Sequence, residues 1–148
     1  MITTCHITDI RQLLAWRREV LSEVFGSEPS QELMEANLRY YDAHIPDNSH
    51  QAVVARYDGV DAGCGGVCFY DELPSPDNPA GACAYLMNIY VRPEFRRRGV
   101  AHAIVSRLIH EARTRGCDKI YLESTPIGMK LYQKFGFVPM ENYFKLHE

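Results

Sequence analysis

Residues 82–101 read ACAYLMNIYVRPEFRRRGVA, and this stretch decides the fold of the chain. Its first ten residues, Ala82–Val91, are an apolar run without polar alternation, which is typical of a strand covered on both faces. From Val100 onward, apolar residues recur every three or four positions until Gly116, which predicts an amphipathic helix and its stop. The order is therefore a buried strand, a short basic turn and a helix.

The basic turn predicts an anion site. A helix begins with several unpaired backbone N–H groups and carries partial positive charge there. Arg96, Arg97 and Arg98 add full charges and donors shaped for phosphate oxygens. Gly99 and Ala101 are small enough for a ligand to approach the backbone. We therefore expect a phosphate or pyrophosphate group here. The glycine spacing differs from the Walker A and dinucleotide-binding motifs.

The remaining pattern predicts a mixed α/β sheet with helices on both faces. The dipeptide Asp58-Gly59 separates two β-prone runs and predicts a hairpin. Gly63, Gly65 and Gly66 indicate a bulge or a close approach in the second run. Strand–helix–strand alternation in the second half implies a parallel, right-handed crossover. Strands are expected at residues 2–7, 51–57, 60–70, 82–91, 119–123 and 137–146. Helices are expected at residues 10–25, 33–45, 100–115 and 126–134, the first of them capped by Thr8.

Stripes of residues on two of the predicted helices refine these expectations. The first helix shows Ile10, Leu13, Leu14, Arg17, Leu21 and Val24 on one side. The last shows Ile127, Leu131 and Phe135, which predicts its packed face. Trp16, Tyr40 and Tyr41 are interpreted as core by default.

Composition places the chain among ordinary globular domains. Its 148 residues fit one domain, 1–148, with 46% hydrophobic and 24% charged residues. A net charge of −3 argues against general nucleic-acid binding. We see neither a membrane-spanning run nor a signal peptide. Five cysteines without a secretory signal suggest reduced thiols and a cytoplasmic protein.

No metal site is expected. Cys64 and Cys68 lie four residues apart but in a strand-like segment, where small buried residues are the simpler interpretation. His102 and His110 share a helix face without a third ligand nearby. The sequence places His44, His50, His102 and His110 most simply on the surface or on helix faces.

The second half of the chain resembles the GNAT superfamily of N-acetyltransferases. Arg96, Gly99 and Ala101 fill its phosphate-loop signature [R/Q]-x-x-G-x-[G/A]. The later stretch LYQKFGF, residues 131–137, is similar to the family's LYxKxGF motif. The two motifs are separated by one helix and one strand, as in the family. The resemblance is close from Gly81 onward and extends to the first half only in element order.

This resemblance implies acetyl-coenzyme A as cosubstrate, bound where the central parallel strand pair splays apart. The pyrophosphate would lie on the turn, and the pantetheine arm would pair with the open strand edge like an added strand. Arg97 fills a position that is often Gly in the family, and Thr125 one that is often Asn. The residues expected to contact the cosubstrate are Asn88, Ile89, Tyr90, Val91, Arg96, Arg97, Arg98, Gly99, Val100, Ala101, Thr125 and Tyr132.

Tyr132 and Glu123 are the expected catalytic residues. Tyr132 lies off the packed stripe and aligns with Thr125 and Gly128 at helical spacing. A phenol there could protonate the departing thiolate. Many family members carry a glutamate on the central strand, but Tyr85-Leu86-Met87-Asn88 has no carboxylate. Glu123 is the nearest candidate base, although an exposed strand-end charge explains it equally well.

The expected function is acetyl transfer from acetyl-coenzyme A to a primary amine by direct attack. Backbone N–H groups near Asn88 and Ile89 would polarise the thioester carbonyl. Two alternatives remain: a non-catalytic acyl-coenzyme A-binding module, and a nucleic-acid-binding domain using Arg96, Arg97 and Arg98. Polyamine, aminoglycoside, amino acid, peptide N-terminus and protein lysine all stay open as acceptors, with Tyr40 and Tyr41 as possible contacts. Homodimers are common in the family.

Overall fold

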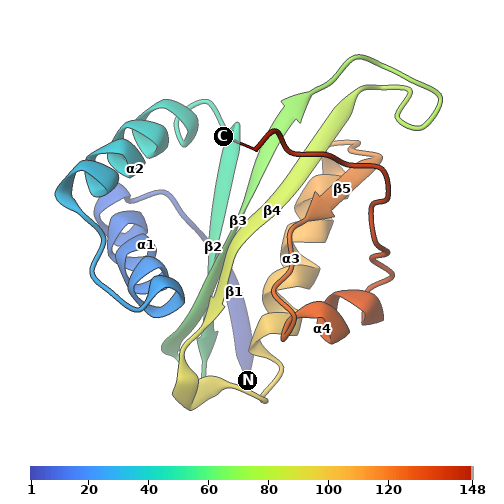
Figure 1. Ribbon diagram of the computed structural model, residues 1–148. Coiled ribbons are helices and arrows are strands. Elements are labelled where there is room, and N and C mark those ends of the chain that lie inside the picture. Colours follow the sequence, from blue (N-terminus) through green and yellow to red (C-terminus); the bar gives the residue numbers. More distant parts are fainter. Residues whose placement is uncertain (148) are drawn as a thin grey trace.

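A computed structural model describes residues 1–147 and shows one five-stranded sheet in the order β1-β2-β3-β4-β5 (Figure 1). The strands are β1 (Ile2–Ile7), β2 (His50–Tyr57), β3 (Val60–Asp71), β4 (Ala82–Val91) and β5 (Lys119–Leu122). Neighbours from β1 to β4 pair antiparallel, whereas β4 and β5 pair parallel. The predicted mixed, mostly antiparallel sheet with one parallel pair is confirmed.

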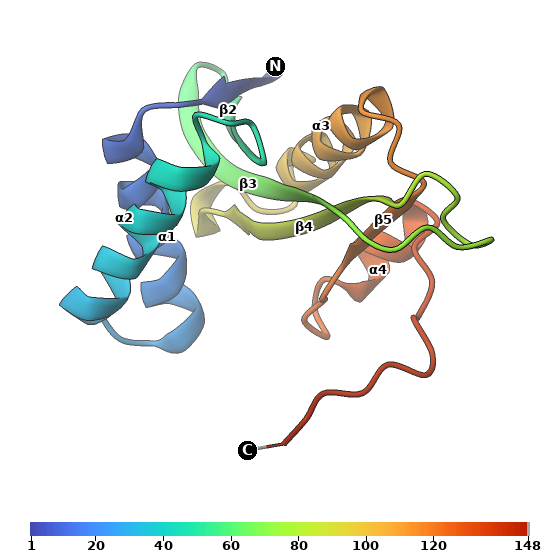
Figure 2. The same ribbon diagram turned by 90° about the horizontal axis from the view of Figure 1, so that it is seen from above.

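Helices cover both faces of the sheet, as expected (Figure 2). Helices α1 (Ile10–Phe25) and α2 (Gln31–His44) pack on one face, and α3 (Val100–Thr114) packs on the other. A 3-10 turn, η1 (Pro93–Phe95), precedes α3, and α4 (Met129–Lys134) follows β5. Within residues 1–147, no helix combines the length and apolar character needed to cross a bilayer.

Two apolar cores hold these layers together. On the α3 face, helix residues such as Ile104 and Leu108 pack on Val53 and Leu86 of the sheet, all essentially without solvent exposure. The second core, under α1 and α2, contains Leu13, Trp16, Val20, Tyr41, Val54 and Tyr90. Burying each large apolar side chain contributes about 1.5–3 kcal/mol. Trp16 and Tyr41 therefore belong to the core, as was expected from the sequence.

The helix boundaries follow local capping chemistry. Asp9, rather than the expected Thr8, caps α1, since its side chain accepts from the backbone N–H groups of Arg11 and Gln12. Gly26 ends the helix with φ +73°, a left-handed conformation that favours glycine. Val24, expected in the packed stripe, lies on the last turn of α1 and is 60% exposed.

The C-terminal segment differs most from expectation. Residues 137–146 were expected to form a strand, but the structure shows none there. Pro139 lacks the N–H that a ladder requires, and Asn142 adopts φ +68°, which interrupts an extended chain. The side chains of Val138, Phe144 and Leu146 are consequently exposed.

Three smaller expectations are also corrected. Helix α4 begins at Met129 rather than at residue 126, because residues 126–128 form a turn. Ile127 on that turn is 94% exposed and is not part of the packed stripe, although Leu131 and Phe135 do pack on the core. Strand β5 ends at Leu122, one residue before the expected end.

His50 is buried rather than superficial, with 4% exposure. Its Nδ1 lies 2.8 Å from the hydroxyl of Tyr40, and its pairing register places it opposite Cys68. Burial, together with the positive charges of His44 and Arg17, lowers the pKa of His50 to about 4. His50 is therefore a neutral core residue at physiological pH.

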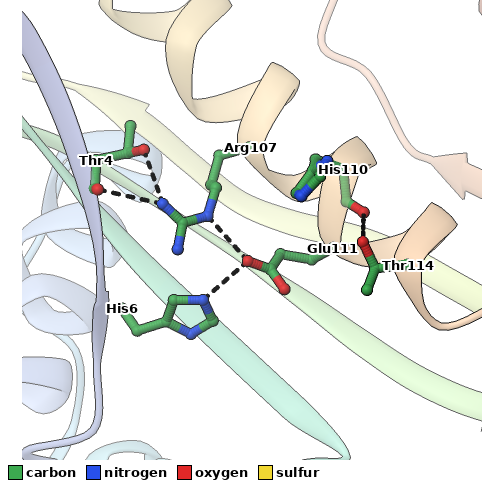
Figure 3. A network of polar contacts seen from close by, with 6 residues as sticks. All are labelled: Thr4, His6, Arg107, His110, Glu111 and Thr114. Atoms are coloured by element: carbon green, nitrogen blue, oxygen red, sulfur yellow. Dashed lines mark hydrogen bonds and ion pairs between the residues drawn. The ribbon is translucent and has the colours of Figure 1, made fainter.

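Edge strand β1 is fastened to α3 by a polar network (Figure 3). Glu111 accepts from Arg107 Nε at 2.9 Å, and its Oε1 lies 2.9 Å from His6 Nε2. Arg107 also donates to the carbonyl and hydroxyl oxygens of Thr4, each at 3.2 Å. Burial raises the pKa of Glu111, but the hydrogen bonds and charges of Arg107 and His6 outweigh it and lower the pKa overall.

We expect Glu111→Gln to lower the free energy of unfolding by about 1.5–3 kcal/mol at pH 7, the usual value of a hydrogen bond to a charged group. Since the pKa of Glu111 is depressed in the folded state, its contribution is present above the unfolded pKa and is lost as pH falls through the folded pKa. Urea unfolding at pH 7 and pH 3 measures this: the difference between the two proteins should shrink at pH 3. Glu141→Gln, at an exposed position, is the control. An undiminished difference at pH 3 would contradict the charge-based account.

Candidate active site

The site is organised by the parting of β4 from β5. Their pairing runs from Cys83–Lys119 to Leu86–Leu122 and stops there. From Asn88 to Val91, β4 has no partner on β5 within residues 1–147. Figure 1 shows the two strands diverging toward the lower end of the sheet. This part of β4 therefore presents an open edge of backbone donors and acceptors, as a splayed strand pair requires.

A bulge in β4 marks the point of divergence. Asn88 adopts φ +57°, which is uncommon outside glycine, and the β3–β4 register shifts between Cys64 and Gly66. Glycines on β3 make this possible. A Cβ on Gly65 would lie 2.5 Å from Ile104 of α3, and one on Gly63 would lie 2.5 Å from the carbonyl oxygen of Tyr90. The sequence predicted a bulge or a close approach at these glycines, and the close approach is confirmed, while the bulge described here lies on the facing strand β4.

The basic turn leads from the open edge into α3. Arg97 and Gly99 both have positive φ, +63° and +84°, and fold the turn tightly. Helices α1 and α2 are capped by Asp9 and Ser30, but within residues 1–147 no side chain caps the amino end of α3 and no acidic residue lies in its first turn. A Cβ on Gly99 would meet only Ile2 Cδ1, at 3.7 Å. The donors at this helix end are thus accessible to an anion.

The three arginines have different surroundings. Arg96 donates from Nε to the carbonyl oxygen of Val91 at 3.1 Å and lies 3.6 Å from Glu23 of α1. The guanidinium of Arg98 lies 5.3 Å from the ring centre of Tyr57. All three arginines are exposed. Arg96 thereby ties the turn to the end of β4, while Arg97 and Arg98 flank it.

Tyr132 lies beside Gly128, as its helical spacing predicts. A Cβ on Gly128 would be 3.0 Å from the Tyr132 ring and 3.5 Å from Thr125 Oγ1. Tyr132 is half-buried against the α3 core and contacts Phe137 edge to face. Burial raises the pKa of Tyr132, so its phenol is fully protonated at neutral pH. Thr125 itself is exposed and accepts from the N–H of Gly128 at 3.3 Å.

Glu123 follows β5 directly, at the point where the two strands part. Its side chain is exposed. Burial and then the negative charge of Glu123 raise the pKa of Tyr85, so the carboxylate lies near the β4 face that carries Tyr85. The rings of Tyr85 and Tyr121 are 4.9 Å apart, and the Tyr121 hydroxyl bonds that of Tyr70. Glu123 thus borders a half-exposed aromatic surface on the face opposite α3.

Arg17 is a site residue that sequence reasoning missed. Its Nη1 donates to Asn88 Oδ1 at 2.8 Å and its Nε donates to Asn37 Oδ1 at 3.0 Å. This contact joins α1 and α2 to the bulge of β4. The sequence offered one indication of this role, a positively charged residue within the apolar stripe of α1, between Leu13 and Leu21.

Arg92, just beyond β4, was also missed. It pairs with both carboxylate oxygens of Glu19, each at 2.9 Å, and its guanidinium lies 4.4 Å from the ring centre of Trp16. The neighbouring cavity of about 190 Å³ between α1 and the sheet is lined by this pair and by the Arg56–Asp61 pair. The charged residues that line this cavity pair with one another, and the Arg92–Glu19 pair holds α1 against the sheet.

The cysteine thiols are not paired with one another. Cys64 and Cys83 are buried, Cys68 is half-buried, and all five cysteines are free. Among residues 1–147, no group of three or more His, Cys, Asp or Glu side chains is arranged to hold a metal ion.

A solved structure resembles this chain over nearly its whole length. A structure of a predicted acetyltransferase with acetyl-CoA from Clostridium acetobutylicum superposes with a TM-score of 0.88 at 26% identity, covering 99% of this chain and 96% of that one.

Two sequence relatives match over shorter stretches. A ribosomal protein bS18-alanine N-acetyltransferase from Salmonella typhimurium is 40% identical over 57 residues, and a glucosamine 6-phosphate N-acetyltransferase from Trypanosoma brucei brucei is 29% identical over 65. These matches cover 36% and 44% of this chain, and 38% and 44% of the relatives, less than half of each.

The model of the acetyltransferase (GNAT) family matches residues 10–137, which include the open edge of β4, the basic turn and Tyr132. The chain therefore belongs to the GNAT family of acetyltransferases.

Proposed function

We propose that this protein transfers an acetyl group from acetyl-coenzyme A to a primary amine. One observation carries the proposal: the open edge of β4 beyond Leu86 leads directly to the uncapped amino end of α3. This places a strand-like binding edge next to an anion site, which matches a ligand with an amide-rich arm and a pyrophosphate. Both sequence relatives are named for acetylating amines, which supports an amine acceptor.

The cosubstrate would bind along this path. The pyrophosphate would lie on the turn from Arg96 to Ala101, where N–H groups and guanidinium groups both donate. The pantetheine amides would pair with the backbone of Asn88, Ile89, Tyr90 and Val91, as an added strand pairs with a sheet edge. Thr125 and Tyr132 would flank the sulfur end. The open space at Gly99 fits such a close approach to the backbone.

The reaction would be a direct displacement. The amine nitrogen attacks the thioester carbonyl carbon, and a backbone N–H near Asn88 or Ile89 stabilises the developing oxyanion. The carbon–sulfur bond then breaks, the sulfur takes the electron pair, and the Tyr132 hydroxyl gives it a proton. The proton lost by the amine passes to Glu123, directly or through water, and the phenolate is reprotonated from solvent. The protein acts mainly by holding the two reactants together.

The protonation state of Tyr132 suits a donor rather than a base. A phenol near pKa ~10 transfers a proton to a thiolate near ~8.5 at a cost of about 2 kcal/mol, which a positioned group can supply. Since burial raises the pKa of Tyr132 further, this cost grows, but the acid form is always available.

A non-catalytic acyl-coenzyme A-binding module is the second candidate. The exposure of Glu123 and the absence of a carboxylate from β4 favour it. Release of free thiol during incubation with acetyl-coenzyme A and an amine panel separates the two, because a binding module releases none above the uncatalysed rate.

Acetyl-coenzyme A should raise the melting temperature clearly at saturation, since a ligand specific for the native state stabilises it by mass action. Gly99→Glu should abolish this shift, because the new carboxylate would occupy the position of the phosphate and repel the phosphate group. Absence of any shift with millimolar acetyl-coenzyme A in the unmodified protein would refute the binding site.

Gly99→Gln is the matched control for that variant. Both side chains meet the same strain, because φ is +84° at this position, so both apo proteins should lose similar stability. Only the charge differs. Equal loss of cosubstrate binding in both variants would show that the shape of Gly99, not the repulsion of a phosphate, is what matters.

Tyr132→Phe tests the proton donor. Turnover should fall by ~10²-fold or more, the usual scale for one general acid, while packing against Phe137 is kept. The Michaelis constant for acetyl-coenzyme A should change little, because the lost interaction belongs to the transition state. Thiol-release kinetics measure both. If the chemical step limits turnover and the rate is unchanged, Tyr132 is only a packing residue.

Glu123→Gln tests the base in the same assay. We expect a fall of 10²- to 10⁴-fold in kcat for an amine that enters as ammonium. Glu141→Gln should leave kcat unchanged. A Glu123→Gln enzyme that turns over normally would show that the amine arrives neutral or loses its proton to water.

A further inference from the structure

Arg17 is a half-buried cation whose partners in the structure are neutral. Its guanidinium is held by the carboxamide oxygens of Asn37 and Asn88, at 3.0 and 2.8 Å. Among residues 1–147, no carboxylate lies within 4.0 Å of it. Other half-buried arginines differ: Arg92 pairs with Glu19 and Arg107 with Glu111.

This arrangement leaves donor capacity unused. A guanidinium carries five N–H groups, and the two contacts use one on Nε and one on Nη1. The other three find no acceptor among residues 1–147. Holding a cation partly out of water without a counterion is costly, and an incoming anion would relieve that cost. The planar fork matches a carboxylate or a phosphate group.

The location of Arg17 links this capacity to the site. Asn88 lies two residues beyond Leu86, where pairing with β5 ends, so Arg17 contacts the bulge at the start of the open edge. Its position is fixed from both sides. Asn37 is itself anchored through a bond from its Nδ2 to the carbonyl oxygen of Leu33, at 2.9 Å. A group bound by Arg17 would therefore lie on the α1–α2 face of β4, the face that carries Tyr85.

We propose that Arg17 binds an anionic group of the acceptor, so that the acceptor is a primary amine that also carries a carboxylate or a phosphate. This inference rests on the proposed acetyl transfer and narrows its acceptor. A polyamine, which has only positive charge, would be repelled by Arg17. Glu123, at the end of β5, would remain available for the ammonium end of such a zwitterion.

The test uses acceptor pairs that differ in the anion. Glucosamine 6-phosphate is compared with glucosamine, and 4-aminobutyrate with butylamine, so the two pairs distinguish phosphate from carboxylate. Calorimetric titration into the 148-residue protein saturated with coenzyme A measures binding, and thiol release measures kcat/KM. At least one of the amines with an anionic group should bind, and its kcat/KM should exceed that of its partner without that group.

Arg17→Gln should lower binding and kcat/KM for the preferred anionic amine by about 10- to 100-fold, the value of a charge-assisted contact. The kcat/KM of the partner without the anionic group should change less than about threefold, and Arg17→Lys should recover part of the loss. Arg18→Gln, next in sequence and paired with exposed Glu28, is the matched control and should leave all acceptors unchanged.

Two results would overturn the inference. One is that neither anionic amine binds or is preferred by the unmodified protein. The other is that Arg17→Gln weakens acceptors with and without the anionic group equally, in which case Arg17 only supports Asn88. The acetyl-coenzyme A-dependent melting shift is measured in every variant, and its loss in the unmodified protein would refute the proposed function instead.

Discussion

The structure depends on one constraint: β4 must pair with β5 over its first half and leave it over its second. Full pairing would close the open edge of β4, whereas no pairing would release β5 from the sheet. The bulge at Asn88 meets both needs, since it turns the strand at the residue where pairing has ended.

That bulge is supported from both faces of the sheet. On one side, Gly63 and Gly65 allow Ile104 of α3 to approach closer than a Cβ permits. On the other, Arg17 holds the Asn88 side chain and connects it to α2. Packing on the α3 face and hydrogen bonds on the α1 face thus hold Asn88 in its strained conformation. Strain that is retained in this way is typical of functional sites.

The sequence predicted what depends on local chemistry. The basic turn, the Asp58-Gly59 hairpin and the close approach at the β3 glycines follow from backbone preferences that a few residues determine. The wrong expectations have two sources, local strand breakers that were given too little weight and tertiary contacts that the sequence does not show. Residues 137–146 have strand-like composition, but Pro139 and Asn142 break the ladder. His50 was expected at the surface, but the packing of β2, β3 and α2 buries it. Arg17 could not be paired with Asn88, 71 positions away, from periodicity alone.

The charges around the bulge also bear on chemistry. An amine must lose its proton to attack, and a nearby cation disfavours its ammonium form. Arg17, if neutralised by an anion of the acceptor, would lose that influence, and Glu123 would then be needed to accept the proton. If Arg17 stays unneutralised, its charge alone would favour the neutral amine and make a base less important. The importance of Glu123 should therefore differ between acceptors with and without an anionic group. For acceptors without an anionic group, the charge of Arg17 would thus take over part of the role of the carboxylate that β4 lacks.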